Sequence, residues 1–135
     1  MPFISTQKGY NNIRHFIFLG GINLKEKLMV VWISRDVEKA INMGFMYAKN
    51  SKLLGWWEEV EIVIWGPSAK IAAENKTIQK ELKEMKEAGV NIKACLACAK
   101  NYGVVEKLKD LDIEVIYMGQ PLTEELKKGT SVITI

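Results

Sequence analysis

Histidine is almost absent from this chain of 135 residues. The single imidazole is that of His15, and none follows it. A Ser-His-Asp or Cys-His catalytic site within the main body of the chain is therefore excluded, as is a histidine-rich metal site. The chain also lacks any apolar run close to the ~20 residues that a membrane helix requires. With 48% hydrophobic and 26% charged residues, the composition is that of one globular domain whose core needs no disulfide.

An excess of charge of one sign is also missing from most of the chain. The net charge is +3, and residues 1–28 account for it with four basic residues and one acidic residue. Residues 29–135 hold fifteen basic and fifteen acidic residues. Because a nucleic-acid-binding domain usually carries a basic face, this neutral body argues against a nucleic-acid partner.

Residues 1–27 are predicted to form an N-terminal arm in front of an α/β domain that spans residues 28–135. The arm contains a short apolar stretch, residues 16–22. That stretch is at the short limit for a signal peptide and no A-x-A-like cleavage site follows it, so we expect a cytoplasmic protein without membrane contact. We interpret the arm as a segment that covers hydrophobic surface on its own or a neighbouring subunit. A native start at Met29 is the alternative.

Strands and helices are predicted to alternate along residues 28–135. Continuous apolar runs are typical of strands buried on both faces, and apolar residues at helical spacing follow them. The predicted strands cover residues 28–33, 60–65, 90–94, 113–118 and 131–135, and the predicted helices cover residues 37–48, 68–88 with an interruption near Asn75 or Thr77, 104–111 and 122–128. This order predicts a three-layer α/β/α sandwich around a mainly parallel sheet of about five strands.

The carboxyl ends of the predicted strands are where such a sheet binds ligands. No G-x-G-x-x-G follows the first strand and no G-x-x-x-x-G-K-[ST] occurs, so these dinucleotide and phosphate loops are excluded. The strand ends hold aromatic, small and charged residues, and the candidates to line a substrate site are Trp32, Arg35, Trp65, Gly66, Pro67 and Ser68. Asp36 is expected to cap the first helix instead.

Cys95 and Cys98, which follow the third predicted strand, are the candidate catalytic residues. Zinc needs about four ligands, and the body of the chain offers two cysteines, so we expect no metal. Cys95 lies where a strand gives way to a helix, and the helix dipole, with Lys93 and Lys100 close in sequence, favours a thiolate there. We therefore expect Cys95 to be alkylated faster than Cys98, which lies one turn further on and can act as a resolving thiol. A thioredoxin-type redox pair and two thiols that only pack remain alternatives.

The segment Ala94–Val104, ACLACAKNYGV, resembles the DsrE/DsrF-like family, which includes the TusD-type subunits of bacterial sulfur relay. The Trp65-Gly66-Pro67-Ser68 segment is similar to the family's Gly-Pro segment at the end of the second strand. The resemblance implies the family's fold, and it implies that Cys95 carries sulfur as a persulfide between donor and acceptor proteins without an organic cofactor. Relay members usually have a small apolar residue where this chain has Cys98.

On this basis the sequence predicts a small sulfur-handling protein that passes sulfane sulfur by thiol exchange. Cys98 would resolve or shield the persulfide, and Gly66, Pro67 and Ser68 would form the opposite wall of the site. The resemblance also implies a homo-oligomer, either a trimer or a hexamer. Two alternatives stay open: an oligomeric binding or scaffold protein without catalysis, and a C-x-x-C disulfide oxidoreductase.

Deleting residues 1–25 should lower the melting temperature or the size of the oligomer. The arm carries four large apolar side chains that we expect to be buried: Phe16, Ile17, Phe18 and Leu19. Burial of each such side chain contributes roughly 1.5–3 kcal/mol to stability before the loss of conformational entropy is subtracted. Melting curves and sedimentation of the truncated and full chains measure both effects, and sulfur loading at Cys95 should survive the deletion. If the truncated chain melts and assembles as before but loses binding to a nucleic acid or an acidic partner, the docking interpretation is wrong.

Overall fold

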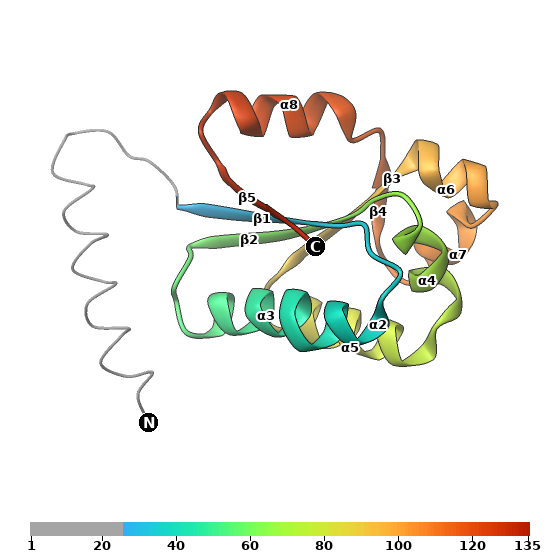
Figure 1. Ribbon diagram of the computed structural model, residues 1–135, viewed down its shortest axis with the longest axis horizontal. Helices are drawn as coiled ribbons and strands as arrows, with labels where there is room; N and C mark the ends of the chain where they lie inside the picture. Colours follow the sequence, from blue (N-terminus) through green and yellow to red (C-terminus); the bar gives the residue numbers. More distant parts are fainter. Residues whose placement is uncertain (1–25) are drawn as a thin grey trace, which may run out of the picture.

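The computed structural model describes residues 26–135, so the expectations for the arm lie outside the described residues. Within that range, five strands form a single sheet in the order β4-β3-β2-β1-β5 (Figure 1). The strands are β1 (Lys27–Trp32), β2 (Glu59–Ile64), β3 (Asn91–Cys95), β4 (Glu114–Ile116) and β5 (Ser131–Thr134). Every pair of neighbouring strands runs parallel, which confirms the predicted parallel sheet.

Helical segments connect the strands. They are α2 (Val37–Lys39), η1 (Ala40–Phe45), α3 (Met46–Leu53), α4 (Ser68–Glu74), α5 (Lys76–Glu87), α6 (Leu96–Tyr102), α7 (Val105–Asp110) and α8 (Gly119–Lys127). Asp36 caps α2 as predicted, because its carboxylate accepts a hydrogen bond from the Lys39 N–H at 3.0 Å. Asn75 ends α4 and caps α5 by accepting from the Ile78 N–H at 2.9 Å, which confirms the predicted interruption. No helix in the described range has the length and apolar character needed to cross a membrane.

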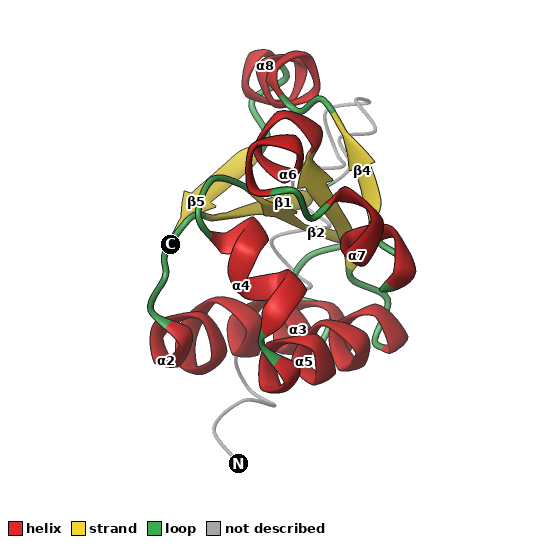
Figure 2. Cartoon of the chain, turned by 90° about the vertical axis from the view of Figure 1, so that its right-hand side faces the viewer, coloured by secondary structure: helices red, strands yellow, loops and turns green. Residues whose placement is uncertain are grey.

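Both faces of the sheet are covered, because successive side chains of a strand point to opposite sides. Leu28 and Val30 of β1 point into a large core that includes residues of α3, α4 and α5. Met29 and Val31 point to the other side, where Leu122 of α8 packs against them. Figures 1 and 2 show α8 on one side of the sheet and α2, α3 and α5 on the other. The three-layer α/β/α sandwich is confirmed.

The helical segment after β1 contains a turn that the sequence does not predict. η1 is a π-helix, and its Gly44 and Phe45 are buried. Gly44 lies so close to the side chain of Ile135 that a Cβ atom at this position would overlap it. Ile135 is itself held beside β1, because its carbonyl oxygen accepts a hydrogen bond from the Ile33 N–H at 2.8 Å. The absence of a side chain at Gly44 therefore permits this contact between η1 and the residue after β5.

The fourth strand is shorter than predicted. The apolar run over residues 113–118 predicts a strand, but β4 covers only Glu114–Ile116 and α8 already begins at Gly119. Pro121 lies in the first turn of α8, where a missing N–H costs no intrahelical hydrogen bond. Met118 is 1% exposed and packs beneath α8, so its burial reflects the helix rather than a longer strand.

A buried carboxylate lies on the α8 side of the sheet, near the amino ends of the strands. Glu61 of β2 is 2% exposed, and its carboxylate lies 2.8 Å from Lys93 Nζ and 3.4 Å from Lys27 Nζ. Lys27 Nζ also lies 3.3 Å from the carboxylate of Glu125 in α8. Two cations thus compensate Glu61 for its lost hydration, and the network links α8 to β1, β2 and β3.

These charges shift the pKa of two members of the network. Burial lowers the pKa of Lys27, but the negative charges of Glu61, Glu125 and Glu59 outweigh burial and leave the pKa above its ordinary value. Burial raises the pKa of Glu125, but hydrogen bonds from Thr130 and Lys27 and the charge of Lys27 outweigh it, so the pKa lies below its ordinary value. The contribution of Glu125 to stability is therefore complete above its unfolded pKa and is lost as the pH falls through its folded pKa. The contribution of Lys27 is lost only as the pH rises through its raised pKa.

Replacing Lys27 with methionine (Lys27→Met) should lower the free energy of unfolding at neutral pH by about 2–3 kcal/mol, because the buried Glu61 then keeps one cation instead of two. Lys128→Met is the matched control. It removes a cation 3.5 Å from the same Glu125, but the Lys128 side chain is 68% exposed, so the loss should stay below about 1 kcal/mol.

Denaturant unfolding of both variants measures the difference. The gap in the free energy of unfolding between wild type and Lys27→Met should narrow as the pH falls through the lowered pKa of Glu125. Equal losses from the two substitutions, or a gap that does not change with pH, would contradict the role assigned to this network.

Candidate functional site

The two cysteines and the turn from Trp65 to Ser68 meet at the carboxyl edge of the sheet. Cys95 caps α6 at the predicted boundary between strand and helix, and Cys98 lies within α6. Cys95 is also the last residue of β3, one residue beyond the predicted strand. The turn joins β2 to α4, which packs against α6. Figure 2 views the molecule from this edge, with α4 and α6 in front of the sheet. Because β2 and β3 are parallel neighbours, the segments that follow them are brought together.

The sulfur of Cys98 has a backbone hydrogen-bond donor. The Gly66 N–H donates to Cys98 Sγ across 3.2 Å. Burial raises the pKa of the Cys98 thiol, the Gly66 N–H opposes this effect, and the neighbouring Cys95 thiol raises the pKa further. The net pKa lies above the ordinary value, so Cys98 is mostly a protonated thiol at neutral pH, with one donor already in place for its anion.

Cys98 is the more exposed cysteine, although the sequence-based expectation makes Cys95 the one that is alkylated faster. Cys95 is 4% exposed and packs with Met29 and Val63 on the α8 side of the sheet, whereas Cys98 is partly exposed. The reason is that Cys95 still belongs to β3, so its side chain points to a covered face of the sheet. Cys98 lies on a helix beyond the edge, where one side is open to solvent.

The two lysines that are close to the cysteines in sequence bind other groups. Lys93 Nζ lies 2.8 Å from the Glu61 carboxylate, and Lys100 Nζ donates a hydrogen bond to the Tyr117 hydroxyl at 2.8 Å. Neither ammonium group hydrogen-bonds a cysteine sulfur among the described residues. The donor at the thiol pair is a backbone N–H instead, which proximity in sequence does not reveal because Gly66 and Cys98 are 32 residues apart.

Three of the predicted lining residues need separate description. Trp32 is 0% exposed, and its ring packs edge-on against Phe45 at 4.9 Å in the core on the α3 side. As a correction to the sequence-based prediction, Trp32 therefore lines no open site, because strand alternation turns it away from Cys95. Arg35 is exposed in the loop between β1 and α2. Trp65 is half-buried and packs in the same cluster as both cysteines.

Ser68 links the ends of β1 and β2. It is 0% exposed, and its hydroxyl lies 2.6 Å from the Trp32 carbonyl oxygen and 2.8 Å from that of Trp65. The Ser68 hydroxyl oxygen also accepts a hydrogen bond from the Trp65 N–H at 3.1 Å. A hydroxyl has one proton to donate and two lone pairs to accept with, so the single proton of Ser68 is shared by two carbonyl oxygens while its oxygen accepts one backbone N–H. Gly66, inside this turn, has a φ of +65°, a value that favours glycine.

The chemistry available at this edge is that of sulfur. Among residues 26–135, no three His, Cys, Asp or Glu side chains are grouped so that they could hold a metal ion. Two adjacent thiols can form a persulfide, a mixed disulfide or a disulfide with each other.

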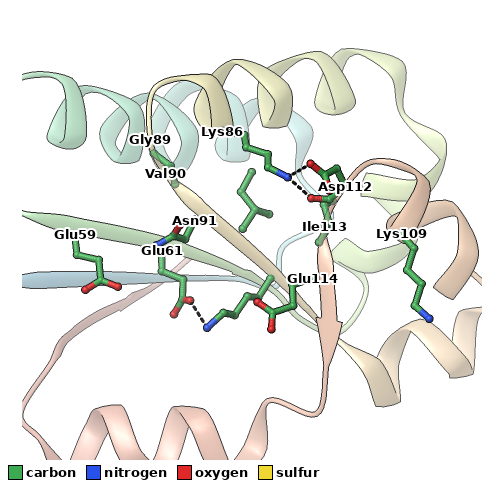
Figure 3. A pocket seen from close by; sticks show the side chains of 12 residues that line it. Glu59, Glu61, Lys86, Gly89, Val90, Asn91, Lys109, Asp112, Ile113 and Glu114 are labelled. Carbon is green, nitrogen blue, oxygen red and sulfur yellow. Dashed lines mark hydrogen bonds and ion pairs between the residues drawn. The ribbon is translucent and has the colours of Figure 1, made fainter.

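A hollow of about 720 Å³ lies at the opposite, amino edge of the sheet (Figure 3). Charged side chains of both signs line it, and several pair with each other: Lys93 with Glu61, and Lys86 with Asp112. None of the site residues predicted from the sequence lies in this region. A carboxylate inside the apolar run of β2, Glu61, was the available signal for a buried charge that needs partners.

Comparison with known proteins agrees with the fold. The model of the DsrE/DsrF-like family matches residues 25–135. A conserved protein of unknown function from Bacteroides thetaiotaomicron, BT1422, has a similar solved structure, with a TM-score of 0.80 and 42% identity over 82% of this chain and 95% of that one. Two more distant structures share the fold. They are MTH1491 from Methanobacterium thermoautotrophicum, of unknown function, with a TM-score of 0.68, 15% identity and coverage of 82% and 100%, and the ychN protein from E. coli, with a TM-score of 0.54, 12% identity and coverage of 83% and 100%. No protein of curated function matches this sequence.

Timed labelling with iodoacetamide near neutral pH should modify Cys98 before Cys95, the reverse of the sequence-based expectation. Cys98 is the accessible sulfur, and its rate should keep rising as the pH approaches its raised pKa, because the thiolate is the nucleophile. Peptide mapping gives both rates. In denaturant the two thiols should react at similar rates, and faster labelling of Cys95 in the folded protein would contradict the burial described here.

Proposed function

Because the chain belongs to the DsrE/DsrF-like family, we propose that it is a sulfur-handling protein that holds sulfane sulfur as a persulfide and passes it on by thiol exchange. The observation that carries this proposal is the pair of adjacent thiols at the carboxyl edge of the sheet. One sulfur is buried and the other is partly exposed. A carrier needs both a protected place for the labile sulfur and a way in from solvent.

Cys95 is the proposed carrier. Its thiolate attacks the outer sulfur of a persulfide or polysulfide donor, the S–S bond of the donor breaks, and the donor leaves as a thiolate with the electron pair. The product is Cys95–S–SH, and the same exchange in reverse passes the outer sulfur to an acceptor thiolate. Atoms and electrons balance without an external oxidant. Cys95 is 4% exposed, so a persulfide on this sulfur would be largely shielded from bulk water.

Cys98 is proposed to act as the neighbouring thiol that shields or resolves the persulfide. If the Cys98 thiolate attacks the inner sulfur of Cys95–S–SH, a Cys95–Cys98 disulfide forms and sulfide leaves. The same contact between the thiols also favours a second candidate function, a disulfide oxidoreductase. A scaffold in which the thiols only pack is the remaining alternative.

Partners of two kinds follow from this proposal. Donor and acceptor proteins would meet the carboxyl edge, where Tyr117 and Ile33 are exposed large side chains. We also propose a homo-oligomer, a trimer or a hexamer. The described domain leaves large apolar side chains on its surface, and these would be covered by contact between subunits: Met43, Met46, Leu53 and Leu126.

Incubation with inorganic polysulfide, followed by removal of the donor and intact-mass measurement, should add about 32 Da to the wild-type protein, the mass of one sulfur. A loss of about 2 Da would instead indicate the disulfide oxidoreductase, and no change would indicate the scaffold.

Single serine variants assign the sulfur. Cys98→Ser should still gain sulfur, whereas Cys95→Ser should lose stable loading, because the remaining thiol is open to solvent. The two variants are matched, since each replaces one thiol of the pair by a hydroxyl. Loading that survives in Cys95→Ser but not in Cys98→Ser would move the carrier role to Cys98.

A further inference from the structure

We propose that Ser68 is a positioning residue that aims the Gly66 N–H at Cys98 Sγ, so that the backbone stabilises negative charge on that sulfur. This inference rests on the proposed function, in which Cys98 must accept or donate an electron pair. It assigns a specific task to a serine that touches neither sulfur through a hydrogen bond of its own.

The first step of the argument is the way Ser68 holds the turn. Its buried hydroxyl shares one proton between the carbonyl oxygens of Trp32 and Trp65, at 2.6 and 2.8 Å, and its oxygen accepts a hydrogen bond from the Trp65 N–H at 3.1 Å. These contacts join the ends of β1 and β2 on both sides of residue 65. The peptide that follows, which carries the Gly66 N–H, is thereby fixed in direction.

The second step is the conformation of Gly66. Its φ of +65° lies in the left-handed region, which residues with a side chain disfavour. Glycine therefore allows the turn to adopt this conformation without backbone strain. The nearest heavy atom to a Cβ at this position would be Ile33 Cγ2 at 3.5 Å, an ordinary contact. The requirement for glycine is therefore conformational rather than steric, and the result of that conformation is an N–H directed at Cys98 Sγ, 3.2 Å away.

The third step concerns the competition at Cys98. Burial and the Cys95 thiol both favour the neutral form of Cys98, and the Gly66 N–H is the group that favours the anion. A hydrogen bond to a charged acceptor is worth more than one to a neutral acceptor. If this N–H turns away from Cys98 Sγ, the thiolate fraction of Cys98 should therefore fall while the fold stays intact.

The test is the pH dependence of Cys98 alkylation in Ser68→Ala, read by peptide mapping. Without the hydroxyl the turn can relax, and the midpoint of the pH–rate profile should move up by about one pH unit, which is about a tenfold lower rate near neutral pH. Ser51→Ala is the matched control. Ser51 is also 0% exposed, its hydroxyl has no hydrogen-bond partner in the described residues, and it lies in α3, away from the carboxyl edge. Its midpoint should equal that of wild type.

Two further variants keep the test decisive. Ser68→Thr retains a hydroxyl and should return the midpoint toward the wild-type value. If Ser68→Ala does not fold, as judged by its melting curve, Gly66→Ala takes its place, because a side chain at φ +65° strains the turn and should displace the same N–H with the same upward shift.

An unchanged or lower midpoint in the folded variant would overturn the positioning role. Polysulfide loading of the wild type is measured in parallel. If the wild type gains no sulfur, the proposed function fails whatever the midpoint does, and if it gains sulfur while the midpoint stays fixed, only the role of Ser68 fails.

Discussion

Five strands that run in one direction determine where the candidate site of this protein lies. Parallel strands place all their carboxyl ends along one edge of the sheet, so the segments after β1, β2 and β3 converge there although they are far apart in sequence. The contact between Gly66 and Cys98, and the bridge from Ser68 to Trp32, both depend on this direction. Reversal of β1, β2 or β3 would carry the segment that follows that strand to the opposite edge of the sheet.

The same sheet separates two kinds of electrostatic environment. At its amino edge, buried Glu61 is compensated by full charges on Lys93 and Lys27. At its carboxyl edge, the thiol pair is served by a backbone N–H and by no contacting side-chain cation among the described residues. A full positive charge beside Cys98 would hold it as a thiolate, open to oxidation. A single N–H leaves it mostly protonated at neutral pH, because burial and the Cys95 thiol keep its pKa raised.

Much of the fold follows from local patterns in the sequence. Apolar runs locate the ends of the strands to within one residue, except at the end of β4, and Asp36 and Asn75 act as helix caps. The sheet order and the π-helical turn at Gly44 do not follow, because they depend on contacts such as that with Ile135. The periodicity of apolar residues identifies the two faces of a strand, but it does not identify which strands lie beside it or which helices pack against it.

The site was predictable in position but not in detail. The thiol pair and the Trp65–Ser68 turn do face each other, as their places after neighbouring strands indicate. The relative exposure of the cysteines was not predictable, because it depends on α8 covering one face of the sheet. The ion pair of Lys93 was not predicted either. Lys93 is close to Cys95 in sequence, but its side chain pairs with the buried Glu61 on the neighbouring strand β2.

The central claim is that sulfur on this thiol pair is held reversibly and passed to another thiol. The most direct measurement loads the wild-type protein with polysulfide, removes the donor, adds an excess of a small acceptor thiol and follows both molecules by mass spectrometry. The account predicts that the protein returns to its reduced mass while the acceptor gains one sulfur for each sulfur that the protein loses. Sulfur that stays on the protein, or a protein that loses its sulfur while the acceptor gains none, would contradict it.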